Sequence, residues 1–384
     1  MAKILVTAEN FAFGPVSKLV TVAEELIKRG HELTFIGEGT AYQLGSKVRF
    51  KKIYRFDTDS KEFIEWGEKI FKKADVVLTS GDRSSVILCQ KLNIPIIWLD
   101  ILFWWWDEIP KFLWNVDLYI QQNSLNNKRN SLKYKNKIKN MKMVGPIIDL
   151  GYKNSRVKKQ LLLGFGGMEA KGWYKIGKDS TYPYTIAKLI MKMVDVGKYE
   201  KVLFVGNERI TNDLSKKFGN KKFVFKMLPH KEFLKEMAES EDVLIIPGLE
   251  TPLEAFAYEK PILFLPPSNS SHYVELDEFR KLHLANKINS LHFADYYPYR
   301  NLAGGNLRKI MEIFLKELKK FENSPEILED CAKRINRYLN LTQKTKNKQK
   351  LYQRKFMSKL GKNGLKETIN LIESFIEKNK LAAN

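Results

Sequence analysis

The sequence predicts an α/β protein built from two doubly wound parallel sheets, and three observations support this prediction. Short apolar runs of the length of buried strands alternate with longer segments whose apolar residues recur at helical spacing. The alternation stops near residue 145 and then starts again. The chain has 384 residues, which exceeds the usual size of one domain. We therefore expect two α/β domains, followed by a helical segment.

The first domain is expected over residues 1–145. It begins with a buried strand at residues 3–7 and an amphipathic helix at residues 16–29, which Gly30 ends. The same alternation continues as strands at 32–36, 76–79, 96–99 and 117–121, with a helix at 84–91. Strands with continuous apolar sequences are typical of a parallel sheet that helices cover on both faces.

The second domain is expected over residues 146–300, after a basic connection at 128–142 and a Gly-Pro break at Gly145. Its predicted strands are at 161–163, 201–205, 222–227, 242–246 and 262–265, and its helices at 184–194, 210–218, 231–239 and 251–258. Residues 301–384 are predicted to form a basic helical extension with a polar interruption at 342–350. In folds of this class, ligands bind at the carboxyl ends of the strands.

The charge balance favours anionic partners. The chain has 66 basic and 44 acidic residues, a net charge of +22. Nucleotides, a phospholipid surface or a nucleic acid would all suit this excess, as would a solvated basic surface without a partner. The Lys-rich runs at 128–142 and 342–359 are not part of a nucleic-acid-binding motif.

The chain is expected in the cytoplasm. Its first residues have the pattern of a strand instead of a signal peptide, and no apolar run is long enough to span a bilayer. Cys89 and Cys331 are far apart in the sequence and indicate neither a disulfide framework nor a metal site. A peripheral contact with the inner face of the membrane is compatible with the positive charge.

The stretch from Pro247 to Pro266 carries the clearest functional signal. An apolar strand leads into a Pro-Gly turn at Gly248, Thr251 stands where a helix would start, and Glu254 follows one turn later. Backbone N–H groups at a helix start attract anions, and a carboxylate nearby can hold vicinal hydroxyls. Phosphate beside ribose describes a nucleotide, so the stretch predicts a site for a sugar-nucleotide.

Two further loops follow predicted strands. The turn Gly164-Phe-Gly-Gly-Met168 comes directly after a strand, where glycines let the backbone approach a phosphate closely. Its spacing is not the G-x-G-x-x-G dinucleotide fingerprint, so this segment alone favours a structural turn over a phosphate site. Leu228-Pro229-His230 closes another strand and can offer backbone groups to a base. His230 by itself fits a helix entry better than it fits a catalyst.

The order of these three loops resembles the donor-binding domain of GT-B glycosyltransferases. The likeness is nearest to the macrolide- and lipid-type UDP-sugar enzymes and to the enzyme that adds N-acetylglucosamine to the lipid-linked peptidoglycan precursor. It covers roughly residues 1–285, including Val144-Gly-Pro-Ile-Ile148 as the linker. The resemblance implies two Rossmann-like domains that face a cleft, an acceptor domain at 1–145 and a donor domain at 146–300. It also implies a nucleotide-sugar donor, UDP-linked, with no metal and no further cofactor.

The resemblance also implies donor-binding residues. Those that match the family's motif are Gly166, Gly167, Met168, Met227, Leu228, His230, Gly248, Thr251, Glu254, Ser271 and His272. It assigns residues 166–168, together with Gly248 and Thr251, to the phosphates. Residues 227–230 are assigned to the base, Glu254 to the ribose hydroxyls, and residues 271–272 to the donor sugar.

One departure from the family concerns the catalytic base. Many relatives carry a Gly-His pair in the first loop, and this chain has Gly14-Pro15 there. Candidates for the missing base are Glu9 in the same loop, then Asp100 at a strand end, and after them Asp82. A carboxylate in this role needs a pKa raised by burial. Glu9 is equally compatible with a loop carboxylate that makes only local hydrogen bonds.

The most aromatic cluster of the chain, Phe103-Trp-Trp-Trp-Asp-Glu-Ile-Pro110, follows Asp100. Its rings can stack on a sugar, enter a membrane interface or pack as a helix under the sheet. Three consecutive tryptophans cannot all face one way. The residues we assign to the acceptor are Asn10, Phe13, Trp104, Trp105 and Trp106.

The sequence therefore predicts a metal-independent hexosyltransferase that moves a sugar from a nucleotide-sugar to a small-molecule or lipid-linked acceptor. The absent histidine leaves a sugar-nucleotide epimerase or hydrolase on the same fold as an alternative. The positive charge leaves a second alternative, a transferase that associates with nucleic acid or with a membrane.

Overall fold

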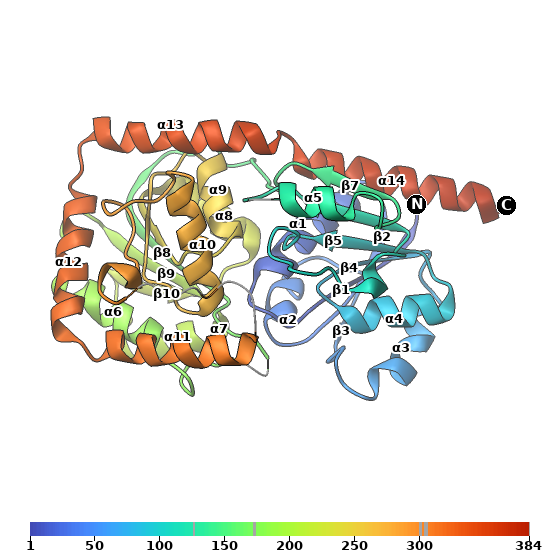
Figure 1. Ribbon diagram of the computed structural model, residues 1–384, viewed down its shortest axis with the longest axis horizontal. Helices are drawn as coiled ribbons and strands as arrows, with labels where there is room; N and C mark the ends of the chain where they lie inside the picture. Colours follow the sequence, from blue (N-terminus) through green and yellow to red (C-terminus); the bar gives the residue numbers. More distant parts are fainter. Residues whose placement is uncertain (126, 172–173, 299–301, 303–305, 384) are drawn as a thin grey trace. The chain divides into compact units, whose positions relative to one another are not determined.

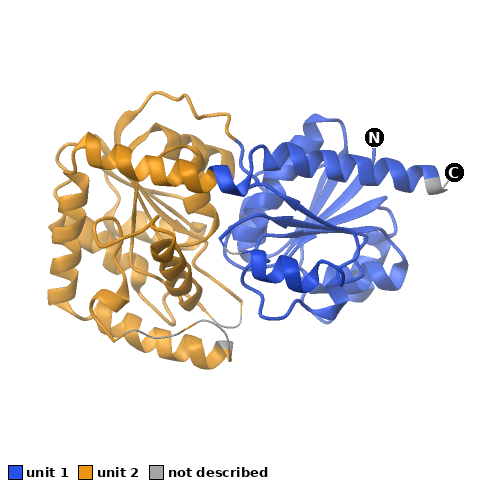
Figure 2. Cartoon of the chain, turned by 45° about the horizontal axis from the view of Figure 1, so that its top comes forward, with its two compact units in different colours: residues 1–149, 358–384 blue, residues 150–357 orange. Residues whose placement is uncertain are grey.

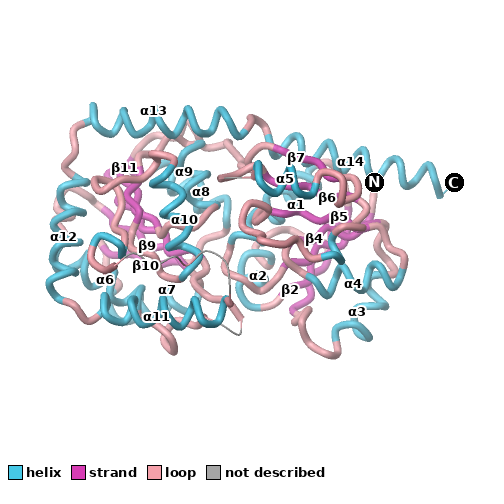
Figure 3. Tube along the Cα trace, in the orientation of Figure 1, coloured by secondary structure: helices cyan, strands magenta, loops and turns pink. Residues whose placement is uncertain are grey.

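The protein consists of two compact units (Figure 2), which we call unit 1 (residues 1–149 and 358–384) and unit 2 (residues 150–357). Each contains one parallel sheet with helices around it (Figure 3), so the predicted two-sheet α/β architecture is confirmed. One boundary is predicted at residues 145–146, whereas the chain passes between the units at 149–150 and again at 357–358. The computed structural model describes residues 1–125, 127–171, 174–298, 302 and 306–383.

The sheet of unit 1 has seven strands in the order β3-β2-β1-β4-β5-β6-β7, and every neighbouring pair is parallel. The strands are β1 (Lys3–Ala8), β2 (Glu32–Gly37), β3 (Lys52–Arg55), β4 (Val76–Ser80), β5 (Ile96–Asp100), β6 (Leu118–Gln122) and β7 (Met141–Val144). The central strands are almost wholly buried, which explains their continuous apolar sequences. The edge strand β3 was not predicted, because its sequence, Lys-Ile-Tyr-Arg, is half polar and only partly buried.

Among the described residues of unit 1, seven helical segments accompany this sheet (Figure 1). They are α1 (Gly14–Lys28), α2 (Gly39–Gly45), α3 (Phe63–Phe71), α4 (Arg83–Leu92), the short 3-10 helix η1 (Lys111–Leu113), α5 (Lys128–Tyr134) and α14 (Gly364–Ala383). Helix α1 has Pro15 in its first turn. Proline lacks a backbone N–H, but N–H groups of the first turn have no partner within the helix, so no helical hydrogen bond is lost. The basic connection predicted at 128–142 contains α5 and the start of β7.

The sheet of unit 2 has five parallel strands in the order β10-β9-β8-β11-β12. They are β8 (Lys158–Gly166), β9 (Lys201–Gly206), β10 (Phe223–Lys226), β11 (Ser240–Ile245) and β12 (Ile262–Phe264). All five coincide with predicted strands. In both sheets the chain starts near the middle, builds outwards to one side and then returns to build the other side. Each sheet therefore has one point where the strand order reverses, between β1 and β4 in unit 1 and between β8 and β11 in unit 2.

The helices of unit 2 connect these strands and continue beyond them (Figure 1). They are α6 (Tyr182–Met193), α7 (Glu208–Phe218), α8 (His230–Glu239), α9 (Glu250–Ala257), α10 (Ser270–Lys281), the 3-10 helix η2 (Phe293–Asp295), α11 (Leu307–Glu322), α12 (Pro325–Leu339) and α13 (Gln343–Leu360). A helical C-terminal region is thus present, as predicted. The predicted start of this region, at residues 300–301, lies outside the described residues.

The polar interruption predicted at residues 342–350 is wrong, because residues 343–350 form the first half of α13. Tertiary contacts stabilise this polar helix: Lys346 forms an ion pair with the buried Asp242, and the Gln349 side chain donates to the carbonyl of Ile262 at 2.7 Å. The last helix, α14, belongs to unit 1. There the backbone N–H of Gly145 donates to the carboxylate of Glu367 at 2.9 Å.

Candidate functional site

The carboxyl ends of the strands at the two reversal points are where doubly wound sheets bind ligands. In unit 2 these strands are β8 and β11, and the loops that follow them contain residues 166–168 and 248–251. Two of the three loops predicted from the sequence to bind the donor therefore leave neighbouring strands at the reversal point. In unit 1 the corresponding strands are β1 and β4, which are followed by Glu9 and Asp82.

The bend after β8 depends on backbone geometry that favours glycine. Gly166 has a φ of +62°, and Met168, with a φ of +50°, is also left-handed. Asn207, which follows β9, holds this bend. Its side-chain nitrogen donates to the carbonyl of Gly167 at 2.7 Å, and its oxygen accepts from the N–H of Ile210 at the start of α7 at 2.9 Å. Asn207 was not predicted to have this role, although an Asn between a strand and a helix is the usual signal of a helix cap.

The turn after β11 brings Gly248 next to His272. A Cβ atom at Gly248 would lie 3.6 Å from His272 Nε2. The ring is held from its other side, because Ser268 Oγ lies 2.9 Å from Nδ1. The side-chain oxygen of Asn269 accepts from the N–H of His272 at 2.9 Å and from Ser271 Oγ at 2.7 Å, so both predicted sugar-binding residues stand at the capped start of α10.

Burial lowers the pKa of His272 to about 3. The imidazole is therefore neutral at physiological pH and can act on a ligand only through hydrogen bonds. Thr251, Met227 and Leu228, three further residues of the predicted donor site, are partly exposed.

Two of the predicted donor residues are in direct contact. His230 Nε2 lies 2.9 Å from Glu254 Oε1, and the Glu254 side chain is only 2 % exposed. His230 begins α8 after the third predicted loop, and Glu254 lies on α9 after the second. Glu254 is thus a buried carboxylate with an imidazole partner. The pair joins the loop assigned to the base with the residue assigned to the ribose.

Two further buried acidic residues, one on α9 and one on α10, were not singled out from the sequence. Glu250 stands in the first turn of α9, and Glu275 lies on α10, three residues after His272; both are less than 10 % exposed. Burial and the negative charge of Glu250 raise the pKa of Glu275 well above its ordinary value. The surroundings of Glu275 therefore favour the neutral form of its carboxyl group. For Glu250, the sequence signal was its position between Gly248 and Thr251, two residues that were predicted to bind phosphate.

In unit 1, Glu9 stands at the reversal point. Its backbone N–H donates to the carbonyl of Ser80 at the end of β4 at 3.2 Å. A side chain at Gly81 would collide with Glu9, because a Cβ there would lie 2.7 Å from Oε2. Burial, followed by the negative charges of Asp59 and Asp82, raises the pKa of Glu9 to about 7. A carboxylate with this pKa is matched to proton abstraction near neutral pH.

The other two carboxylates considered as bases have structural partners. Asp82 caps α4, accepting from the N–H of Ser85 at 3.1 Å and from its hydroxyl at 2.6 Å. Asp100 is 3 % exposed; one oxygen accepts from the N–H of Leu102 at 2.7 Å, and the other accepts from Trp106 Nε1 at 3.1 Å and from the hydroxyl of Tyr119. Burial raises the pKa of both carboxyl groups.

The residues assigned to the acceptor have different surroundings. The Asn10 side-chain oxygen accepts from the N–H of Thr40 at 3.0 Å and fastens the first loop to α2. Phe13 precedes α1 and is partly exposed. The tryptophan segment forms turns instead of a packed helix. Trp104 is only 7 % exposed and stands edge-on to Trp105, with ring centroids 5.4 Å apart.

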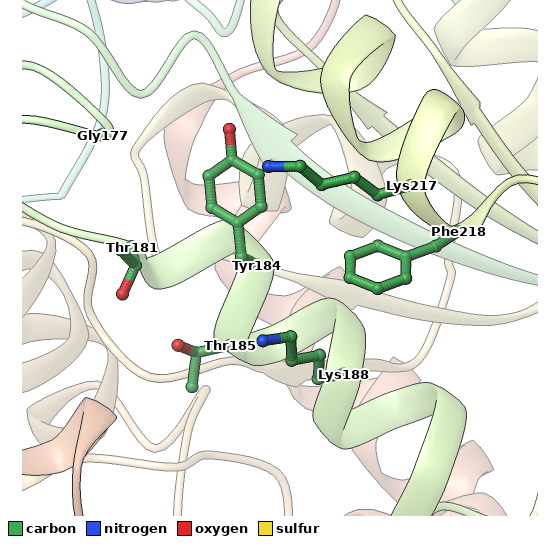
Figure 4. Close-up of a pocket in the computed structure, with 7 residues that line it drawn as sticks. All are labelled: Gly177, Thr181, Tyr184, Thr185, Lys188, Lys217 and Phe218. Atoms are coloured by element: carbon green, nitrogen blue, oxygen red, sulfur yellow. The ribbon is translucent and has the colours of Figure 1, made fainter.

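A surface hollow of about 520 Å³ lies elsewhere in unit 2 (Figure 4). It is lined by Gly177, Thr181, Tyr184, Thr185, Lys188, Lys217 and Phe218. Lys217 is already engaged there, since its Nζ lies 2.9 Å from Asp213 and 4.8 Å from the centre of the Tyr184 ring. None of the predicted donor residues lines this hollow, so the candidate site rests on the strand-end loops.

Two absences concern the described part of the chain only. Within it, no three His, Cys, Asp or Glu residues are grouped so that they could hold a metal ion. In the same residues, every helix is too short or too polar to cross a membrane.

Comparison with known proteins identifies the fold. No protein-family model and no curated protein matches the sequence. Among solved structures, the spinosyn rhamnosyltransferase SpnG complexed with spinosyn aglycone is similar over 97 % of this chain and 100 % of its own, with a TM-score of 0.56 and 11 % identity. Streptomyces sp. SF2575 glycosyltransferase SsfS6 is similar over 97 % and 100 %, with a TM-score of 0.53 and 12 % identity.

A third solved structure, Anabaena HepE in complex with UDP and glucose, is similar over 98 % of this chain and 100 % of its own, with a TM-score of 0.51 and 11 % identity. These likenesses span nearly the whole chain. The protein therefore has the GT-B glycosyltransferase fold, which confirms the fold that the sequence resemblance implied.

Proposed function

We propose that the protein is a glycosyltransferase that moves a hexose from a UDP-sugar to a hydroxyl of its acceptor. One observation carries the proposal. The reversal point of the unit 2 sheet brings together the left-handed bend at Gly166 and the turn at Gly248, the two loops whose sequences have the features of a phosphate site. The reported complexes of structural neighbours with UDP and glucose and with an aglycone support the same substrate classes.

The donor would be held mainly by the backbone. Glycines at 166 and 167 let the diphosphate approach the backbone after β8. The N–H of Gly248 donates to the carbonyl of Ile246 at 2.8 Å, so at the second turn the phosphate would be held by the start of α9, which begins directly after it. Such N–H groups stabilise the charge that develops on the leaving UDP, the role that a metal ion has in other transferases. The neutral His272 and the hydroxyl of Ser271 would contribute hydrogen bonds to the sugar. The His230–Glu254 pair would hold the nucleoside.

The acceptor would be activated by unit 1. Glu9, with its pKa of about 7, takes the proton of the attacking hydroxyl as the new glycosidic bond forms and the bond to the UDP oxygen breaks. Asp82 and Asp100 are occupied by their structural partners.

The buried thiols of Cys89 and Cys331 are free, which suits a reducing cytoplasm.

A thermal-shift panel of UDP, GDP, dTDP and CMP tests the nucleotide. A ligand at 100 times its dissociation constant stabilises the folded state by about 2.7 kcal/mol, so a specific nucleotide stands out clearly. We expect UDP to give the largest shift and Glu254→Gln to reduce the UDP shift. Glu232→Gln, an exposed carboxylate on the neighbouring helix α8, is the matched control and should respond like the wild type. An unchanged UDP response in Glu254→Gln would remove the nucleoside assignment.

Incubation with UDP-sugars and no acceptor tests the reaction. A transferase consumes the donor slowly under these conditions, because water is a poor substitute for the acceptor. Rapid release of free sugar, or formation of an epimer, would overturn the transferase proposal in favour of a hydrolase or an epimerase on the same fold.

A further inference from the structure

We propose that the outer face of helix α13 is a docking surface for an anionic phospholipid bilayer. The helix contains seven basic residues and no acidic residue over Gln343–Leu360. The residues assigned to the donor and to the acceptor lie on other elements of the fold. A one-sided concentration of positive charge attracts an anionic surface.

Contacts with the body of unit 2 fix the inner face of α13. Lys346 is ion-paired with the buried Asp242, and Gln349 donates to the carbonyl of Ile262 at 2.7 Å. Two turns further along, the ring of Phe356 stands edge-on to an aromatic ring of α9, with centroids 6.4 Å apart. These contacts set the rotation of the helix about its own axis, so a constant set of side chains faces outwards.

The outward side chains alternate charge with apolar surface. They recur three or four residues apart, they are all exposed, and we call them the α13 stripe: Lys344, Lys348, Leu351, Tyr352 and Lys355. Leu351 is 46 % exposed and Tyr352 is 43 % exposed. Lysines around a leucine and an aromatic residue suit contact with a membrane interface, because the lysines can reach the headgroups while the two apolar side chains enter the headgroup region.

A loop beside α13 has the same character. Glu259 is ion-paired with Lys153 at 3.1 Å and with Arg354 of α13 at 3.5 Å, so the loop at residues 150–157 lies next to the helix. This loop exposes Leu150 at 46 % and Val157 at 52 %. It also carries exposed basic residues at positions 153 and 156. The loop therefore extends the basic and apolar surface of the α13 stripe.

The exposed apolar side chains favour a bilayer over a nucleic acid. Both partners are anionic, but only the bilayer buries apolar surface in addition to neutralising charge. The tryptophan segment of unit 1 is less suited to this role, because Trp104 is buried and the indole N–H of Trp106 is bonded to Asp100.

Vesicle flotation with the full chain tests the proposal. The wild type should float with phosphatidylcholine vesicles that contain phosphatidylglycerol and remain unbound with pure phosphatidylcholine. Each lysine near an anionic surface contributes roughly a five-fold gain in partitioning, so Lys344→Gln/Lys348→Gln/Lys355→Gln should partition on the order of 100-fold more weakly. The control Lys316→Gln/Lys319→Gln/Lys320→Gln removes the same charge from α11, on another side of unit 2 (Figure 1), and should float like the wild type.

A second variant tests the apolar contribution. Leu351→Ser/Tyr352→Ser keeps every charge, and it should lose the part of vesicle binding that persists at high salt. Equal weakening by the α11 control, or no flotation of the wild type, would overturn the proposal. So would tighter binding of the wild type to duplex DNA than to anionic vesicles, unaffected by Leu351→Ser/Tyr352→Ser. Circular dichroism of each variant checks that the substitutions, all on exposed side chains, leave the fold intact.

Discussion

The reversal points of the two sheets have similar topology and different chemistry. In unit 1 the strand-end loops present a carboxylate, Glu9, whose pKa is raised to about 7 by burial and by neighbouring acids. In unit 2 they present glycines, and the histidine beside them is neutral because burial lowers its pKa to about 3. One crevice is thus suited to accepting a proton, and the other to surrounding an anion with N–H groups.

The difference shows how one backbone plan can serve two halves of a reaction. In a doubly wound sheet the strands fix where the loops meet, and the loop residues decide what meets there. A glycine has a different purpose on each side. Gly81 in unit 1 leaves room for the carboxylate of Glu9, whereas Gly166 in unit 2 permits a left-handed bend.

The largest effect that we predict is on catalysis, from Glu9→Gln. Removing a general base slows the chemical step by roughly 10²- to 10⁴-fold. In the wild type, the transfer rate should rise as the pH increases through about 7, because Glu9 must be ionised to accept the proton. The variant should lose this rise while its affinity for UDP stays unchanged. The measurement is the transfer rate of both proteins between about pH 5.5 and about pH 8.5, a range of roughly three pH units around the pKa of Glu9.

The exposed carboxylate Glu65 on α3 provides the control for this experiment. Glu65→Gln should keep the rate and the pH profile of the wild type. If Glu9→Gln retains both, the base lies elsewhere, and the similarity between unit 1 and an acceptor-activating domain loses its chemical basis.

The next predicted effect of Glu9→Gln is on stability. The substitution should stabilise the folded protein, although it lowers the activity. The pKa of Glu9 is raised from its ordinary value of 4.5 to about 7, so the folded state holds the proton more tightly than the unfolded state does. Stability is therefore lost as the pH rises from about 4.5 to 7, by on the order of 3 kcal/mol in total. Glu9→Gln removes the ionisable group, and it should be more stable than the wild type at pH 8 by up to that amount, with little difference near pH 4.5.

Urea denaturation followed by tryptophan fluorescence measures this difference in unit 1, because six of the seven tryptophans lie within residues 1–149. A variant that loses activity and gains stability identifies a carboxylate retained for function. Equal stabilities at both pH values would show that the pKa of Glu9 is not raised.

The sequence predicts the elements with strong apolar patterns and misses those that depend on tertiary contacts. All five strands of unit 2 are recognisable because their apolar runs are continuous. The first half of α13 is not recognisable as a helix from the sequence, because its residues are polar. It is stabilised by the ion pair between Lys346 and Asp242. Likewise β3 is an edge strand of four residues with charged ends, which gives only a weak strand pattern.

The same limit applies to the candidate site. Spacing along the chain identifies the loops, because each follows a predicted strand. It cannot show that His230 and Glu254, 24 residues apart, lie in contact, since that depends on how α8 and α9 pack. Nor can spacing show that the carboxylate of Asp100 accepts hydrogen bonds from Trp106 and Tyr119. An aspartate at a strand end gives the same sequence pattern with or without such bonds.

The smallest effects compare two glycines of unit 2. Gly166→Ala places a side chain at a φ of +62°, which costs about 1 kcal/mol and lowers the melting temperature by about 2–4 °C. At Gly248 the backbone is not left-handed, and a Cβ would meet only His272 Nε2 at the ordinary distance of 3.6 Å. Gly248→Ala should therefore change stability by less than about 0.5 kcal/mol. Both variants should lose the stabilisation by UDP, because a methyl group stands between the backbone N–H groups and the diphosphate. Thermal denaturation with and without UDP separates the two effects. A Gly248→Ala variant that keeps its full UDP response would exclude this turn from the phosphate site and leave the bend at Gly166 as its only support.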